Sequence, residues 1–342
     1  MRLMATYRSI VGLKIKKRSS DPSNPVLGEM WYNTTSKTLK VRGFGSATWS
    51  SGNTAPGAYM SFAGAGTQSA YIKTMGNDGS PAPNPVANDT AIYDGTNWTS
   101  GPSNPLSRRD PGGFGIETAA IFFGGQKDTP EPQRAITAQT WDGSSFTSVP
   151  NMNHRRRTCN GTGLSTTGLI VGGAGDPSGS PEGAMTNVES YNGSSFSNET
   201  AIPTAFRGGG QAGSEPAAIC IGGLATTGTT SFEYDGSSWT SGGTTNTARN
   251  TNFAGSAGTQ TAALIYGGGP SVPQAESYDG TSFAVDSTMA AGASGRGNQN
   301  SQAYSTTAIY VGSPNPPGSA PGANTVNEYT AAAAATTTVT VS

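Results

Sequence analysis

The sequence predicts an all-β fold, a β-propeller of four-stranded antiparallel blades, and three features of its 342 residues indicate it. An aromatic hexapeptide, YDGSSW at 234–239, recurs at intervals of 43 to 50 residues, and an apolar run ending in two glycines recurs in phase with it. A period of about 40 to 50 residues is typical of propellers. The chain also contains 49 glycines and only 12% charged residues, with a net charge of -1. This composition suits a turn-dense β protein better than a chain kept unfolded by charge repulsion.

Each hexapeptide is predicted to form the tip of a β-hairpin. Its DG or NG pair tolerates positive φ, and an aromatic residue stands on each arm, so the two rings should pack across the turn. The recurring Asp is expected to form the turn and not to act as an acid or base. Complete copies begin at Tyr93, Trp141, Tyr191, Tyr234 and Tyr278, a degenerate copy ends at Trp49, and a last copy at Tyr329 lacks its second aromatic.

The apolar runs are predicted to be strands buried on both faces, with the paired glycines turning the chain after them. A stretch of very small residues precedes each run, as expected for an innermost strand where blades converge. A unit therefore has an inner strand, an apolar strand, a third strand ending in the first aromatic, and an outer strand starting at the second. The runs begin at Ala119, Thr167, Ala217, Ala262 and Thr307, with SAYIKTM at Ser69 as a weakened first member.

The order of an Arg, a small strand, an apolar run closed by GG and two spaced aromatics resembles the kelch repeat, over about residues 39 to 330. With six apolar runs, the resemblance implies a six-bladed kelch-like propeller. The sixth blade takes its first strands from Arg296 to Thr330 and its outer strand from around Trp49. The N- and C-terminal strands would then close the ring and protect the sheet edges. Seven blades is the alternative, with Glu29–Val41 contributing to the seventh.

A second resemblance lies in front of the repeats. The segment DPSNPVLGEMWYNTTSKTLKV, 21–41, resembles a short β motif near the start of many bacteriophage tail and fibre proteins. It implies an N-terminal attachment segment with a β-hairpin at 1–40, carried by Trp31 and Tyr32, and a propeller at 41–342. The tail TTTVTVS fits the same setting and predicts a last strand at Thr337–Val341.

The residue inventory argues against several classes of function. The near-neutral charge speaks against a nucleic-acid surface, and no stretch has the roughly 18 apolar residues of a membrane span. The two cysteines, Cys159 and Cys220, and the single His154 suggest neither a disulfide framework nor a metal site. We therefore expect no catalytic residue, metal or cofactor. A glycosidase stays open, because the separation of two carboxylates cannot be read from a sequence.

Repeated arginines are the best candidates for a binding site. They follow the second aromatic of the hexapeptide by 10 to 13 residues, and equivalent positions in a propeller form a ring at one end. Each guanidinium either caps carbonyls and bridges blades, or joins a cluster for an anionic sugar or a partner's carboxylates. The five are Arg109, Arg157, Arg207, Arg249 and Arg296.

These observations predict a non-enzymatic virion structural protein in a phage tail fibre, tail appendage or surface decoration. Residues 1–40 would bind other virion proteins, in multiple copies on a symmetric particle assembled in the host cytoplasm. The propeller would serve particle assembly or bind a host-surface glycan or receptor. Two alternatives remain: a glycan-degrading hydrolase or lyase, and a cellular kelch-type adaptor that binds another protein.

Overall fold

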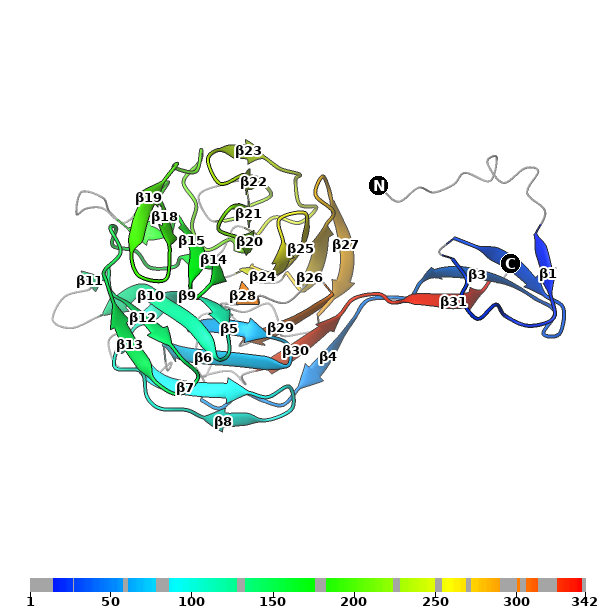
Figure 1. Ribbon diagram of the computed structural model, residues 1–342, viewed down its shortest axis with the longest axis horizontal. Coiled ribbons are helices and arrows are strands. Elements are labelled where there is room, and N and C mark those ends of the chain that lie inside the picture. The colour runs from blue at the N-terminus through cyan, green and yellow to red at the C-terminus, as the bar shows by residue number, and fades with distance from the viewer. Residues whose placement is uncertain are drawn as a thin grey trace. The chain divides into compact units, whose positions relative to one another are not determined.

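The protein forms two compact units, Met1–Thr48 with Ala331–Ser342, and Trp49–Thr330. The computed structural model (Figure 1) describes residues 15–26, 28–57, 61–77, 86–127, 133–175, 183–223, 228–249, 254–268, 272–289, 300–301, 306–312 and 325–339. Strands and turns, and no helix, are found in these residues.

The first unit is a four-stranded sheet in the order β1-β2-β3-β31. Strand β1 (Lys16–Arg18) pairs in parallel with β2 (Met30–Asn33), which forms a hairpin with β3 (Thr38–Phe44). The chain's last strand, β31 (Ala334–Thr338), pairs antiparallel with β3. The expected boundary at residue 40 therefore differs from the observed units, because β3 continues to Phe44 and the C-terminal strand covers its edge. The last strand also begins earlier than the predicted Thr337.

The second unit repeats one four-stranded antiparallel sheet. Within each sheet the inner, apolar, third and outer strands follow in the predicted order. The strands are β5 (Ala63–Thr67), β6 (Ala70–Gly76), β7 (Ala87–Tyr93) and β8 (Trp98–Ser100); β9 (Arg109–Ile116), β10 (Ala119–Lys127), β12 (Ala138–Trp141) and β13 (Phe146–Val149); β14 (Asn160–Leu164), β15 (Thr167–Val171), β18 (Val188–Tyr191) and β19 (Phe196–Glu199); β20 (Gly210–Ser214), β21 (Ala217–Ile221), β22 (Ser231–Tyr234) and β23 (Trp239–Ser241); and β24 (Ala254–Thr259), β25 (Ala262–Gly267), β26 (Gln274–Tyr278) and β27 (Phe283–Thr288).

Shorter elements complete this unit. Strand β11 (Gln133–Arg134) adds to β10, and β16 (Ala174–Gly175) pairs with β17 (Gly183–Ala184). A three-stranded sheet joins distant parts of the chain in the order β29 (Thr307–Gly312), β30 (Thr325–Thr330) and β4 (Thr48–Gly52). Strand β28 (Asn300–Ser301) pairs in parallel with both β24 and β5.

The sheets of the second unit lie around a common centre, with the small-residue strands innermost (Figure 1). Neighbouring inner strands contact one another in chain order, from β5 through β9, β14 and β20 to β24. Their glycines also make room for aromatic rings. A Cβ on Gly64 would overlap the Tyr71 ring, and one on Gly255 would overlap Tyr266. The small side chains of the inner strands thus allow close packing within each sheet as well as between sheets.

Hydrophobic cores lie between successive sheets. In one of them Phe114 and Phe123 of one sheet pack with Ile170 and Tyr191 of the next. A comparable core joins the first sheet to β29 and β30, with Phe62 and Tyr71 against Ile309 and Val326. The free energy of burying this apolar surface is the main stabilising contribution available to so charge-poor a chain.

The glycine pairs after the apolar strands connect neighbouring sheets. Gly124 and Gly125 have φ of 66° and 84°, and the Gly125 N–H donates to the Arg156 carbonyl, 2.9 Å away, at the start of the next sheet. In the first sheet Met75 takes the place of the first glycine and has φ of 60°. The turn geometry is therefore kept where the sequence signal is degenerate.

Candidate functional site

The hexapeptide tips are structural turns. At the tip of 234–239 the Asp235 Oδ1 atom accepts hydrogen bonds from the backbone N–H groups of Ser237 and Ser238, at 2.9 and 2.7 Å. These bonds, the one from Ser238 first, hold the pKa of Asp235 well below its usual range. The rings of Tyr234 and Trp239 lie 4.8 Å apart. The predicted roles of turn-forming Asp and clamping aromatics are confirmed.

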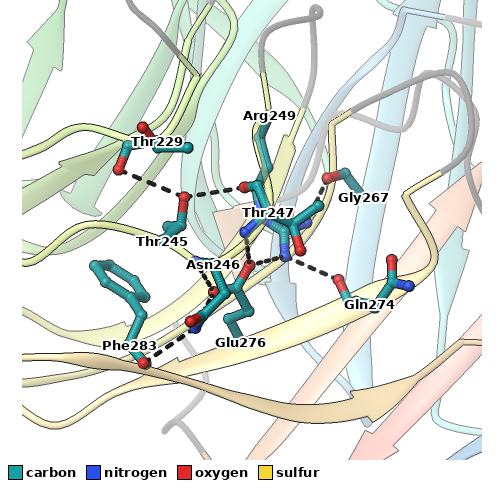
Figure 2. Close-up of polar contacts among 9 residues, drawn as sticks. All are labelled: Thr229, Thr245, Asn246, Thr247, Arg249, Gly267, Gln274, Glu276 and Phe283. Atoms are coloured by element: carbon teal, nitrogen blue, oxygen red, sulfur yellow. Dashed lines mark hydrogen bonds and ion pairs between the residues drawn. The ribbon is translucent and has the colours of Figure 1, made fainter.

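Arg249 is the most deeply buried of the candidate arginines that the structure describes, and Figure 2 shows its surroundings. Its guanidinium donates to the carbonyls of Gly267 and Gln274, at 2.6 and 2.9 Å, and forms an ion pair with Glu276 at 3.0 Å. Both charged side chains are 0% exposed. Burial lowers the pKa of Arg249, and the Glu276 charge opposes this shift.

The loop before Arg249 completes this network. Glu276 also accepts hydrogen bonds from the backbone N–H groups of Asn246 and Thr247, at 2.6 and 3.0 Å. The Asn246 side chain bridges from Glu276 to the Phe283 carbonyl (Figure 2). The buried carboxylate is therefore satisfied on several sides, and the network ties the start of one sheet to its third and outer strands.

The same network occurs a second time around Arg156. Its guanidinium donates to the Gly172 carbonyl at 2.7 Å and pairs with the buried Glu189 at 2.5 Å, while Glu189 accepts from the N–H groups of Asn153 and His154. Sequence reasoning missed this pair. The available signal was an Asn three residues before the Arg, combined with Glu two residues before the Tyr of the following hexapeptide.

The predicted arginine set therefore mixes two structural positions. Arg156 and Arg249 stand ten residues after the second aromatic, whereas Arg109, Arg157 and Arg207 stand eleven residues after it. For Arg249 the capping interpretation applies, because it lies in a closed network. Arg296 lies outside the described residues.

Arg109, Arg157 and Arg207 do share a position at the start of the inner strands, where Arg109 is the first residue of β9 and the other two stand three residues before β14 and β20. The residue after each of these arginines is hydrogen-bonded to its counterpart in the neighbouring sheet. The Thr158 N–H donates to the Asp110 carbonyl, and the Gly208 N–H donates to the Thr158 carbonyl. Arg157 also forms a 2.5 Å ion pair with Asp110 of the preceding sheet, in which the arginine side chain is 18% exposed. This arginine bridges two sheets at the same end of their inner strands.

In the first unit the two predicted attachment residues lie differently. Trp31 is fully buried, and its indole N–H donates to Asp21 at 2.9 Å. Asn33 donates to the same oxygen at 2.8 Å, and these bonds, Asn33 first, lower the pKa of Asp21. Tyr32 is only half-buried. Trp31 therefore organises the unit's interior, and Tyr32 is the one of the two that reaches its surface.

A cavity of about 200 Å³ lies in the second unit beside the first sheet. Its floor is the buried Lys73, Thr90 and Ala91, and its rim includes the exposed Asp89 and Ser100. The cavity is lined by Pro56, Gly57, Lys73, Asp89, Thr90, Ala91, Ser100 and Gly101.

Lys73 is 2% exposed and its ammonium group is closely held. The Nζ atom donates to the Pro56 carbonyl at 2.6 Å and lies 5.6 and 5.8 Å from the ring centres of Phe62 and Trp98. Burial lowers the pKa of Lys73 to about 7, and the Asp89 charge opposes the shift. Sequence reasoning missed this residue, although a charged residue inside an apolar run was the visible signal.

No group of three or more His, Cys, Asp or Glu side chains in the described ranges is arranged to hold a metal ion. Cys159 and Cys220 are buried and free, and burial raises the pKa of Cys159 to about 12. The described part of the chain contains no helical segment of the length and apolar character needed to cross a bilayer.

No protein-family model and no curated protein matches the sequence. Among solved structures, the one titled "Structure of YjhT" is similar, with a TM-score of 0.63 and 11% sequence identity. The match covers 81% of this chain and 95% of YjhT. At this identity the likeness concerns the fold alone. Together with the repeated four-stranded sheets, it shows that the chain has an all-β, propeller-like fold.

Proposed function

We propose that this chain is a non-enzymatic structural protein of a bacteriophage particle. The second unit is a six-bladed, kelch-like propeller that presents a binding surface to the host or to the particle. The first unit attaches the chain to other virion proteins, in several copies on a symmetric tail or surface structure. Its place is then the virion, after assembly in the host cytoplasm.

Contacts between the first and last sheets support a closed ring of six blades. The ring centres of Trp49 on β4 and Tyr329 lie 5.2 Å apart. This distance is close to the 4.5 Å between the ring centres of Tyr278 and Phe283, which belong to one hairpin. The indole N–H of Trp98 donates to Asn53 just after β4, as that of Trp239 donates to Thr200 just after β19. Strand β4 thus has the contacts of an outer strand, and the three-stranded sheet counts as the sixth blade.

The hairpin of the first unit bears on the alternative of seven blades. Its sheet partners are β1 and β31, both within the first unit. This pairing favours six blades, with the hairpin reserved for attachment.

The proposed attachment rests on the first unit, which is compact by itself and contains the segment that resembles the phage tail motif. The buried Trp31 and Asn33 both donate to the exposed Asp21, and the C-terminal strand covers the edge of β3. A small sheet that forms a compact unit by itself is suited to dock on a larger assembly.

Purified particles of the virus whose genome encodes this chain provide the test. Mass spectrometry should find the chain in particles that remain intact through density-gradient purification, at a constant ratio to the other structural proteins. Its absence from such particles would refute the proposal. Incubation of the purified chain with host envelope polysaccharide tests the enzymatic alternative, because release of oligosaccharide contradicts a purely structural role.

A further inference from the structure

Lys73 interrupts a column of apolar residues in the repeated sheets. In the first sheet Tyr71 of the apolar strand pairs with Tyr93, the first aromatic of the hexapeptide. Each of the other apolar strands has an equivalent residue that pairs with the first aromatic of its own hexapeptide. Two residues further along the apolar strands stand Lys73, Phe122, Ile170, Cys220, Ile265 and Tyr310. The fold accepts an uncharged side chain at this position in every other sheet. Because burying an ammonium group is unfavourable, the lysine is better explained by a function than by packing.

The cavity above Lys73 combines hydrogen-bond donors and acceptors with a balanced charge. Lys73 at the floor donates, Asp89 at the rim accepts, and the exposed Ser100 hydroxyl does both, whereas the Thr90 hydroxyl is bonded to that of Thr74. One of these groups is basic and the other acidic, so a ligand of either net charge would meet a like charge, whereas a neutral molecule with several hydroxyls can accept from the amine and donate to the carboxylate. The rim residues Asp89 and Ser100 are exposed to solvent.

The size of the cavity restricts the ligand further. Its 200 Å³ is below the about 300 to 1,000 Å³ of sites for drug-sized ligands. A single six-membered sugar ring is a neutral, hydroxyl-rich molecule of suitable size. We propose that the cavity bounded by Lys73, Asp89 and Ser100 binds one neutral saccharide unit of a surface glycan. The assignment rests on the proposed function, since it names the ligand class for the binding surface of the propeller.

An internal comparison is provided by the fourth sheet. It carries the same tripeptide WTS, at 239–241, and the Gly242 N–H donates to the Ser231 carbonyl as the Gly101 N–H donates to Thr90. There, however, the position of Lys73 is taken by Cys220, and that of Asp89 by Thr230. Ser241 is therefore a matched control for Ser100, in the same local backbone but without the charged pair.

The full-length chain is tested by saturation-transfer NMR with glucose, galactose, mannose and N-acetylglucosamine. At least one sugar should bind with a Kd near 1 mM, which sugar concentrations of about 10 mM will detect. Asp89→Asn and Ser100→Ala should each weaken binding about tenfold, the amount expected for losing a hydrogen bond in a site with charged groups. Lys73→Met should abolish binding, and Ser241→Ala should leave it unchanged.

Folding and binding are separated by the Tm of each variant. Lys73→Met should keep or raise the Tm while losing the sugar, because an apolar residue occupies this position in other sheets. A lowered Tm with binding retained would show that Lys73 is structural and would overturn the assignment, as would the absence of saturation transfer for every sugar. If the chain is found on particles but binds no sugar, only this assignment fails. If it binds a sugar at Lys73 but is absent from particles, the virion role fails instead.

Discussion

At the scale of single residues, Lys73 makes stability depend on pH in a defined direction. Folding lowers its pKa from about 10.4 in an unfolded chain to about 7. Between these values the unfolded chain holds a proton that the folded chain has released, so the free energy of unfolding rises with pH. The cost of burying the charge is complete below pH 7 and is relieved as the pH approaches 10.

This predicts that Lys73→Met is more stable than the wild type at pH 6 and that the difference narrows from pH 7 to pH 10. The difference between the two free energies of unfolding should shrink by at most about 1.4 kcal/mol per pH unit. Urea denaturation of both proteins across this range measures it, and the subtraction removes the contribution of all other titrating groups. A difference that stays constant with pH would contradict the buried, titrating lysine.

The two buried Arg–Glu pairs lead to a second prediction at this scale. Arg249→Met leaves Glu276 ionised and buried without its cation, which should lower the free energy of unfolding by about 3 to 5 kcal/mol. Arg157→Met should cost less, because its ion pair with Asp110 is partly exposed. Urea midpoints at an unchanged m-value give both numbers. Equal losses would mean that burial does not distinguish the two arginine positions.

These residues also show where prediction from sequence reached its limit. Arg249 follows its preceding aromatic by one residue fewer than Arg157 and Arg207 do, and this single residue decides which neighbours the guanidinium meets. Arg249 therefore lies inside a network, whereas Arg157 bridges two sheets. The Lys73 cavity depends on residues from three strands and on Pro56, so no local pattern contains it.

At the scale of strands and turns, the hexapeptide was predictable because its chemistry is local. The DG pair, the flanking aromatics and the serine N–H groups that bind the Asp all lie within six residues, and the structure realises them as expected. The hairpin near Trp31 was likewise expected, but its pairing with β31 joins residues that are far apart in sequence. Neither segment carries a repeat marker of the kind that Trp49 and Tyr329 provide, so this pairing was not predicted.

The turn makes a prediction that separates its backbone role from its charge. Asp235→Asn should leave the Tm unchanged, because Asn192 already accepts the same two backbone hydrogen bonds in another copy. Asp235→Ala removes the acceptor and should lower the Tm by a few degrees. Thermal unfolding followed by circular dichroism measures both. If Asn and Ala lower the Tm equally, the charge itself matters and the assignment as a turn former is incomplete.

At the scale of the whole molecule, the contacts between the first and last sheets resemble those between sheets that are neighbours in sequence. The Tyr93 hydroxyl donates to Glu328 at 2.5 Å, and the Tyr278 hydroxyl donates to Glu233 at the same distance. The first bond joins residues at opposite ends of the repeated region, and the second joins consecutive sheets. If the proposed ring is closed, the two bonds are equivalent.

Tyr93→Phe and Tyr278→Phe should therefore lower the free energy of unfolding by similar amounts, about 1 kcal/mol each. Phe keeps the ring that packs on Trp98 or Phe283, so the change isolates the hydroxyl. Chemical denaturation of the two variants provides the comparison. A loss for Tyr278→Phe with none for Tyr93→Phe would indicate that the first and last sheets do not stay together in solution.

In the proposed function this chain is part of a virus particle, attached by its first unit and presenting its propeller. Immunogold electron microscopy of gradient-purified particles tests it most directly, with an antibody raised against the purified chain. Gold is expected at a repeated position on the tail or surface of most particles. Unlabelled particles, with the chain recovered only from the soluble fraction of the lysate, would contradict it.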